Sequence, residues 1–272
     1  MNKPLPRNLF TDDVAKSYDS TMVPIFFEPY AHDLAARVQA LAPDAVLEVA
    51  CGTGVVTRAL ASQLPATCAI TATDLSEAMV ARAERVGTSR SVHWAQANVI
   101  ALPYENASFD VVLCQFGVMF FPDRIAAYRE IGRVLRPGGT FLFSTWNTIE
   151  HNAFDAVVVE ALARRYPDEP VTFMSHVVHG YTSPLDIESD VQAAGFDTFQ
   201  ISSLDQVSLA SSPEQAAIAL CHGTPLRNEI EAREPGGLTL AVAAAADAIR
   251  QHFGNGTIEA RMSALVIEAS KP

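Results

Sequence analysis

The 272-residue sequence predicts an α/β fold in which a mostly parallel sheet is built from strands joined by crossover helices. Two observations lead to this prediction. Between residues 44 and 146, short apolar runs rich in β-branched and aromatic residues alternate with stretches that have the spacing of amphipathic helices. After residue 146 the sequence is rich in alanine and valine, and two further β-like runs lie too far apart for a hairpin turn.

Seven runs are predicted as strands. They cover residues 45–50, 69–73, 92–96, 109–114, 140–146, 199–207 and 257–269. Each of the first five consists mainly of apolar residues, as expected of strands that are buried on both faces. The helical patterns between them predict that these five strands run parallel.

The predicted helices fill the intervals between the strands. They cover residues 55–64, 76–86, 123–135, 151–165, 185–194 and 238–253. In the third helix Ile125, Tyr128 and Ile131 recur at helical spacing, and the Pro-Gly-Gly sequence at 137–139 ends the pattern. A further helix is expected to begin at Ser212, which precedes a proline suited to a first helical turn.

The composition excludes several classes of protein. The chain is 49% hydrophobic, which is enough for a buried core and excludes a disordered chain. Its net charge of -12 disfavours binding to nucleic acid or to anionic membranes, so no nucleic-acid partner is expected. The four cysteines have no CxxC spacing and are expected to be reduced and buried. With neither a signal-like N-terminus nor a long apolar run, we expect a cytoplasmic protein without integral membrane association.

The most informative stretch runs from Val46 to Thr57, where a buried strand passes through two glycines into a helix. Gly52 and Gly54 allow a tight turn and a close approach of the backbone to a ligand. The first amides of the following helix face the same crevice, beyond the carboxyl ends of the strands, where open α/β sheets bind ligands. A nucleotide-like ligand is therefore the first hypothesis.

An acidic residue at the end of the second strand, Asp74, is placed to accept hydrogen bonds from both hydroxyls of a ribose. Both dinucleotide enzymes and methyl-donor enzymes use this arrangement. Two details separate them here, because Thr57 replaces the third glycine of the dinucleotide fingerprint and Glu48 lies inside the first strand. A carboxylate would repel a pyrophosphate but would attract an ammonium and a sulfonium, so the pattern favours S-adenosylmethionine over NAD.

Five sequence blocks in a fixed order resemble the class I S-adenosylmethionine-dependent methyltransferases that act on small molecules. The blocks are Glu48–Gly54, Asp74–Ser76, Asn98 with Leu102–Tyr104, Ser108–Asp110 and Arg133–Gly139. This resemblance implies a Rossmann-like, doubly wound, seven-stranded sheet, mostly parallel with an antiparallel last strand, and helical lid insertions. It covers residues 40 to 146 closely and is weaker beyond them.

The resemblance also implies a set of donor-binding residues. Glu48 would organise the methionine end, Asp74 would bind the ribose and Leu75 would press on the adenine. Asn98 stands where the family usually has an aspartate, and its amide oxygen can still accept a hydrogen bond from the adenine amino group. The full set is Tyr18, Glu48, Ala50, Cys51, Gly52, Thr53, Gly54, Asp74, Leu75, Met79, Asn98, Val99 and Gln115.

A single domain over residues 1–272 is expected, with four parts. These are an N-terminal helical cap over 1–40, a donor-binding core over 41–146, a helical substrate-side segment over 147–197, and the last two strands over 198–272 with a helical insertion at about 211–256. Acceptor choice is expected to reside outside the core. The candidates for an apolar acceptor wall are Ile25, Phe26, Phe27 and Tyr30 of the N-terminal segment, with Phe116, Met119, Phe120, Phe154 and Phe173.

The expected chemistry is in-line transfer of the methyl group to an O, N or C atom of a small molecule, such as a phenol, a quinol or an amine. No catalytic base stands out; His222, Tyr30 and His151 are the weak candidates, followed by His176, His179 and Glu28. No metal site is expected. An NAD-type oxidoreductase and a non-catalytic S-adenosylmethionine-binding protein remain alternatives, and the protein is expected to be a monomer or a homodimer.

Overall fold

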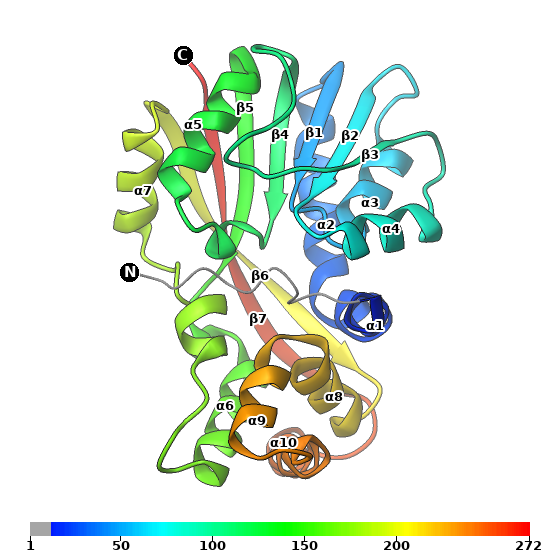
Figure 1. The fold of residues 1–272 in the computed structure, drawn as a ribbon, viewed down its shortest axis with the longest axis vertical. Coiled ribbons are helices and arrows are strands. Elements are labelled where there is room, and N and C mark those ends of the chain that lie inside the picture. The colour runs from blue at the N-terminus through cyan, green and yellow to red at the C-terminus, as the bar shows by residue number, and fades with distance from the viewer. Residues whose placement is uncertain (1–11) are drawn as a thin grey trace.

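The computed structural model describes residues 12–272 and contains one seven-stranded sheet (Figure 1). Residues 1–11, the start of the predicted N-terminal cap, lie outside the described residues. The strand order is β3-β2-β1-β4-β5-β7-β6. The strands are β1 (Ala45–Val49), β2 (Ala69–Asp74), β3 (His93–Gln96), β4 (Phe109–Gln115), β5 (Leu135–Trp146), β6 (Thr198–Ala210) and β7 (Ile258–Ser270).

The strand directions confirm the predicted fold class. Strands β1 to β5 pair in parallel, and β7 is antiparallel to both of its neighbours, β5 and β6. The order reverses at β1, which has β2 on one side and β4 on the other. In a doubly wound sheet the crevice at such a switch point is the usual ligand site.

Helices precede the first strand and connect the strands that follow. They are α1 (Asp12–Ser17), η1 (Tyr18–Phe27), α2 (Glu28–Ala40), α3 (Val55–Gln63), α4 (Glu77–Val86), η2 (Val118–Phe120), α5 (Arg124–Val134), η3 (Ile149–His151), α6 (Ala153–Arg165), η4 (Phe173–Val178), α7 (Pro184–Ala193), α8 (Pro213–Gly223), α9 (Leu226–Arg233) and α10 (Leu238–Phe253). Of these, η1 and η4 are π-helices, whereas η2 and η3 are short 3₁₀ turns.

The core forms on the two faces of the sheet, because alternate residues of each strand point to opposite faces. On one face Val112 and Phe143 join a buried cluster with Tyr128 of α5. On the other face Val111 and Leu142 pack in a second cluster with residues of α2 and α3. The helices on both faces explain why the central strands are almost continuously apolar.

Strands β6 and β7 pair over thirteen residues each, from Thr198 opposite Ser270 to Ala210 opposite Ile258. Figure 1 shows that this pair continues below the sheet, where α6, α8, α9 and α10 gather around its far end. The helical insertion between the last two strands is therefore attached to the sheet through the strands that flank it.

The structure differs from the sequence prediction at three places. Strand β5 begins at Leu135 rather than at residue 140, because the Pro-Gly-Gly segment forms an irregularity within the strand and shifts its register against β4. The proline-bearing segment after residue 166 contains the π-helix η4, and the insertion contains an additional helix, α9. Apolar spacing of 3.6 residues does not identify π-helices, which have a different periodicity.

Two further observations concern the chain as described from residue 12 onward. Its helices include none with the length and apolar character needed to cross a membrane. The four cysteines, Cys51, Cys68, Cys114 and Cys221, are free thiols and all are buried. Burial raises the pKa of the Cys51 thiol well above its ordinary value. Cys68, Cys114 and Cys221 therefore serve as small core residues.

Candidate functional site

The turn between β1 and α3 has a left-handed backbone. Ala50, Gly52 and Gly54 have φ angles of +54°, +54° and +83°. At Gly54 a Cβ atom would also lie 3.0 Å from the ring of Trp94, so both the backbone and the space require glycine there. Ala50 adopts its positive φ without that freedom, which is a strained conformation of the kind found at functional sites.

Asp74 connects this turn to the end of β2. Its Oδ2 accepts a hydrogen bond from the Gly52 amide at 2.9 Å, and its Oδ1 accepts one from the Ser76 amide at 2.8 Å. The Cys51 amide donates to the Thr73 carbonyl at 2.9 Å. Burial raises the pKa of Asp74, and the backbone amides act in the opposite direction. The two loops that carry the donor motifs therefore form one hydrogen-bonded unit.

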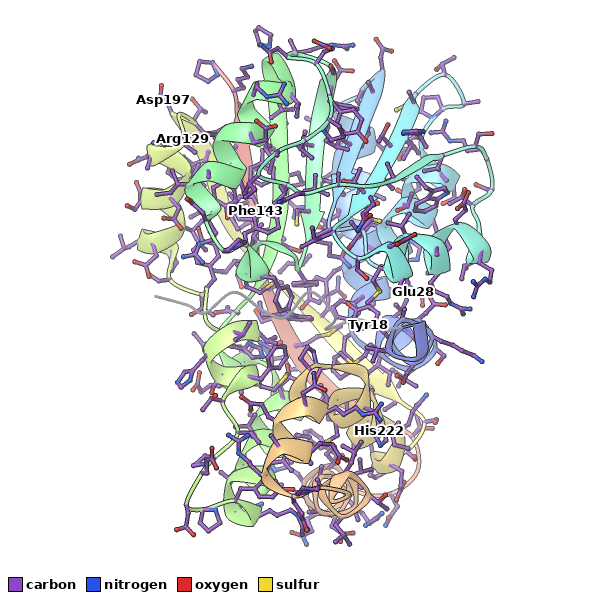
Figure 2. All side chains as sticks on the ribbon, viewed as in Figure 1. Tyr18, Glu28, Arg129, Phe143, Asp197 and His222 are labelled. Atoms are coloured by element: carbon purple, nitrogen blue, oxygen red, sulfur yellow. The ribbon has the colours of Figure 1, made fainter. Side chains whose placement is uncertain are left out.

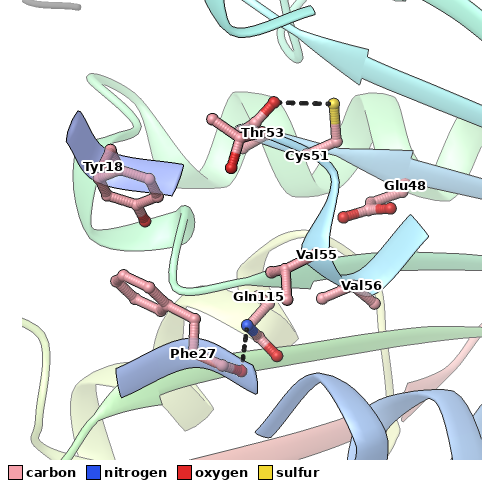
Figure 3. Close-up of a pocket in the computed structure, with 10 residues that line it drawn as sticks. Tyr18, Phe27, Glu48, Cys51, Thr53, Val55, Val56 and Gln115 are labelled. Carbon is pink, nitrogen blue, oxygen red and sulfur yellow. Dashed lines mark hydrogen bonds between the residues drawn. The ribbon is translucent and has the colours of Figure 1, made fainter. Parts of the chain in front are cut away.

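A pocket enclosing about 300 Å³, part of it open to solvent, lies over this turn (Figure 3). Its walls come from the β1–α3 turn, from the N-terminal helical segment and from the end of β4. The lining residues are Tyr18, Phe27, Glu48, Ala50, Cys51, Gly52, Thr53, Val55, Val56 and Gln115. The pocket thus lies at the carboxyl end of β1 and β4, at the switch point of the sheet.

Glu48 is the buried acid of the pocket. It is 1% exposed, and its Oε2 accepts a hydrogen bond from Thr57 Oγ1 at 2.5 Å. Burial raises the pKa of Glu48 to about 8, although the Thr57 bond and the nearby Arg58 lower it. Within residues 12–272 no basic side chain forms an ion pair with this carboxyl group. A cation in the pocket would supply the missing positive charge.

Gln115 holds the aromatic side of the pocket. Its Nε2 donates to the carbonyl of Phe27 at 3.2 Å, as the dashed line in Figure 3 marks. The Phe27 ring stacks with Tyr18 at a centroid distance of 5.1 Å. Behind Phe27, the rings of Phe116 and Trp146 stack at 3.8 Å, and Phe116 has a φ of +51°. The pocket is therefore continuous with a buried aromatic cluster.

The residues present fit S-adenosylmethionine. Two polar atoms of pocket-lining residues, Gln115 Oε1 and Thr53 Oγ1, are buried and have no hydrogen-bond partner. Unsatisfied buried atoms of this kind are costly unless a ligand pairs with them. Together with the unpaired Glu48 they form a set of acceptors suited to an ammonium group and a neighbouring positive charge. A pyrophosphate would find no cation in this lining.

The structure brings together seven of the predicted donor residues around the pocket, namely Tyr18, Glu48, Ala50, Cys51, Gly52, Thr53 and Gln115. Gly54 forms the turn below them, and Asp74 is joined through Gly52. Leu75 is 61% exposed beside Asp74, which leaves its side chain available to a ligand. Met79 is 3% exposed and packs in the core. These assignments stay predictions.

Asn98 and Val99 do not line the pocket, whereas Val55, Val56 and Phe27 do. Asn98 Oδ1 accepts from the Ile100 amide at 3.2 Å within a tight turn that also includes Val99. Sequence analysis did not include Val55 and Val56, although both follow Gly54 directly and any ligand on that turn would meet them. Phe27 was expected only in an acceptor wall, and it lines this pocket as well.

The three main catalytic candidates lie outside the pocket lining. The Tyr30 hydroxyl donates to the Leu204 carbonyl at 3.4 Å, and burial raises its pKa. His151 contacts Thr148 Oγ1 at 2.9 Å on an exposed 3₁₀ turn. His222, whose pKa is lowered by burial, ends α8 in the helical insertion, and Figure 2 shows it apart from Tyr18.

The secondary catalytic candidates are His179, His176 and Glu28. His179 is buried between Asp155 Oδ2 at 2.9 Å and the Asn147 carbonyl at 2.8 Å. His176 lies in η4, and Glu28 begins α2. None of the three lines the pocket. In the described part of the chain, no group of three His, Cys, Asp or Glu side chains is arranged to hold a metal ion.

Comparisons with known proteins identify the family of this chain. A family model described as a methyltransferase domain matches residues 47–143. A demethylmenaquinone methyltransferase of Corynebacterium urealyticum is 30% identical over 206 residues, which cover 71% of this chain and 86% of the relative. One from Staphylococcus aureus is 38% identical over 94 residues, which cover 34% of this chain and 39% of that relative.

A solved structure shares the fold. Phosphoethanolamine N-methyltransferase 2 of Haemonchus contortus, in complex with phosphomonomethylethanolamine and S-adenosylhomocysteine, superposes with a TM-score of 0.61 at 18% identity. The match covers 97% of this chain and 58% of that one. The comparisons give no support to an NAD-type oxidoreductase. This chain belongs to the class I S-adenosylmethionine-dependent methyltransferases.

Proposed function

We propose that this enzyme methylates a small, flat, apolar acceptor of the quinol or phenol class. The observation that carries the proposal is the stacked pair of Tyr18 and Phe27, which borders the donor pocket and continues into Phe116 and Trp146. Aromatic rings recognise flat aromatic molecules through stacking and edge contacts. The similarity to demethylmenaquinone methyltransferases supports the same class of acceptor.

The donor is held by the turn after β1 and by Asp74. The left-handed turn would present backbone groups to the ligand, and the Asp74 carboxylate, which is hydrogen-bonded to that turn, would bind the ribose hydroxyls. Glu48, Gln115 and Thr53 accept hydrogen bonds or balance positive charge at the methionine end. When bound, S-adenosylmethionine supplies an electrophilic methyl group.

The protein's contribution to the chemistry is alignment and exclusion of water. Tyr18 and Phe27 close one side of the pocket over the turn (Figure 3). A hydroxyl acceptor needs its proton removed, whereas an amine needs only to be unprotonated. Tyr30, His151 and His222 remain the candidates for a base, and in a quinol or phenol the accepting atom is O or a ring C. In-line geometry alone accounts for a large part of such rate enhancements.

A screen with methyl-labelled S-adenosylmethionine tests the proposal. The acceptors are short-chain quinols, phenols, amines and carboxylates. The amount of labelled methyl group transferred to each acceptor is measured. We expect the labelled methyl group to be transferred to quinols or phenols and not to amines or carboxylates. Transfer confined to amines or carboxylates would overturn the acceptor class, and failure to bind S-adenosylhomocysteine would overturn the donor site.

We also infer the setting in which the enzyme works. It is a cytoplasmic protein that acts as a monomer or a homodimer, consists of a single domain over residues 1–272, and has no nucleic-acid partner. The net charge of -12 supports the last point, because it repels polyanions. Light scattering tests the oligomeric state, and a gel-shift assay with duplex DNA and RNA tests the absence of a nucleic-acid partner.

A further inference from the structure

The N-terminal helical segment reaches across the donor pocket from outside the sheet. Helices α1 and η1 precede α2, and η1 begins with Tyr18 and ends with Phe27, both of which line the pocket. Figure 3 shows the two rings facing each other beside the turn that carries Thr53. What holds this segment in place therefore controls how the pocket is closed.

The residue next to Tyr18 is bound by two arginines. Asp19 Oδ2 accepts from Arg82 Nη2 at 2.8 Å and from Arg82 Nε at 3.2 Å, and Asp19 Oδ1 accepts from Arg58 Nη2 at 3.4 Å. The Asp19 side chain is 11% exposed, and the two arginine side chains are 27% and 24% exposed. Charged hydrogen bonds that are partly shielded from water are stronger than exposed surface pairs.

The two arginines come from the helices that follow the donor motifs. Arg58 lies on α3, directly after the glycine turn, and Arg82 lies on α4, after Asp74. Arg58 Nη1 also donates to the Thr53 carbonyl at 2.7 Å, within the turn itself. A continuous chain of contacts thus runs from α4 through Asp19 and Arg58 to the backbone of the pocket.

We propose that Asp19 is a positioning residue that latches the N-terminal segment onto α3 and α4, so that Tyr18 and Phe27 stay closed over the bound donor. The inference rests on the proposed donor site. Opening the segment breaks both ion pairs between the Asp19 carboxylate and the two guanidinium groups. The latch therefore slows release of S-adenosylmethionine before transfer and of S-adenosylhomocysteine after it.

Farther along η1, Met22 is held by packing rather than by charge. A Cβ atom at Gly223 of α8 would lie 2.6 Å from Met22 Cγ, so this part of η1 fits closely against the helical insertion. This packing does not depend on whether residue 19 carries a negative charge. The charge dependence of donor release is thus a specific consequence of the Asp19 contacts.

The experiment measures S-adenosylhomocysteine binding, which needs no acceptor. Calorimetry gives the Kd, and rapid-filtration chase of radiolabelled ligand gives the dissociation rate. For Asp19→Asn we expect a Kd about tenfold higher, mainly through faster dissociation, which corresponds to about 1.4 kcal/mol. Asp19→Glu, which keeps the charge, should recover most of the affinity.

A matched control uses an acid outside the pocket. Asp33 of α2 pairs with Arg37 at 2.6 Å and does not line the pocket, so Asp33→Asn should leave both constants unchanged. Arg82→Gln removes the same contact from the other partner and should reproduce the Asp19→Asn defect. This second variant keeps the test valid if Asp19→Asn does not fold.

The outcomes separate the two proposals. If the wild-type protein does not bind S-adenosylhomocysteine, the donor site is overturned and the latch with it. If it binds, and folded Asp19→Asn or Arg82→Gln shows wild-type Kd and dissociation rate, the latch alone is overturned. An Asp19→Glu variant as weak as Asp19→Asn would also overturn it, because charge would then not be the cause.

Discussion

The carboxylate of Asp74 accepts a hydrogen bond from the backbone amide of Gly52 at 2.9 Å, across the ends of two neighbouring strands. One residue thereby serves two purposes. It ties the left-handed glycine turn to the end of β2, and in the proposed donor site its carboxylate would also accept hydrogen bonds from the ribose. Loss of Asp74 should therefore affect both the shape of the site and its affinity.

Replacing Asp74 with alanine should weaken S-adenosylhomocysteine binding by about 1.5–3 kcal/mol, the range for hydrogen bonds to a charged group. Calorimetry measures the change. Asp110→Ala is the control, because Asp110 also accepts from two backbone amides, those of Asp44 and Ala45, but at the opposite end of the sheet. Both variants should lose stability, and only Asp74→Ala should lose affinity; equal affinities would contradict the assigned role.

Gly117→Ala should disrupt the pocket. A Cβ atom there would lie 2.6 Å from Cys114 Sγ and 2.7 Å from Ala50 Cβ, so the strained turn must shift. We expect about 1–3 kcal/mol of destabilisation in urea unfolding and weaker donor binding. At Gly132, inside α5, the nearest atom would be 3.5 Å away, and alanine should stabilise by about 0.5–1 kcal/mol. If Gly117→Ala bound the donor as tightly as the wild type, the contact between position 117 and Ala50 would not affect the pocket.

Donor binding should depend on pH through Glu48. Burial raises its pKa to about 8 from an ordinary value of 4.5, so the folded protein binds this proton more tightly than the unfolded chain does. Its contribution to stability is therefore fully present below 4.5 and is lost as the pH rises through 8. Affinity for the cationic donor should rise over the same range, because binding favours the ionised carboxylate.

The proton released from Glu48 can be counted directly. Calorimetry of S-adenosylmethionine binding at pH 7 in phosphate and in Tris, whose ionisation enthalpies differ, gives the number of protons released. The wild-type enzyme should release a proton, and Glu48→Gln should abolish that release and flatten the pH dependence of affinity. Identical proton release in the two proteins would assign the effect to another group, with Asp74 the nearest alternative.

Tyr30→Phe should leave turnover within about threefold of wild type, because the Tyr30 hydroxyl is bound to the Leu204 carbonyl and lies outside the pocket lining. Stability should fall by about 0.5–1.5 kcal/mol, as expected for the loss of one hydrogen bond. The kcat on the best acceptor from the screen and the midpoint of urea unfolding measure these effects. A hundredfold fall in kcat in a folded variant would instead make Tyr30 a catalytic residue.

The donor half could be predicted from sequence because its signals are local. The glycines, Glu48 and Asp74 lie within or just after strands whose apolar runs are unambiguous, and six of the seven predicted strands begin within one residue of the observed position. Strand β5 is the exception, since its early start depends on pairing with β4 and not on its own sequence.

The rest of the site depends on contacts between distant segments. Asp19 meets Arg58 and Arg82 only after the N-terminal segment packs on the core, and neither spacing nor periodicity indicates those pairs. The positive φ of Ala50 is likewise set by its surroundings, because alanine has no intrinsic preference for it. Tyr18 and the loop after β1 were both predicted from the sequence as donor-binding residues, but the ion pairs that hold the N-terminal segment in place could not be predicted.

The Phe116–Trp146 stack has a practical consequence. The chain has two tryptophans, and the other, Trp94, lies against the glycine turn at Gly54. One indole thus lies beside the turn proposed to bind the donor, and the other lies in the aromatic cluster proposed to face the acceptor. Intrinsic fluorescence of single-tryptophan variants would therefore follow occupancy of each side separately, without an added dye, and would reveal which ligand arrives first.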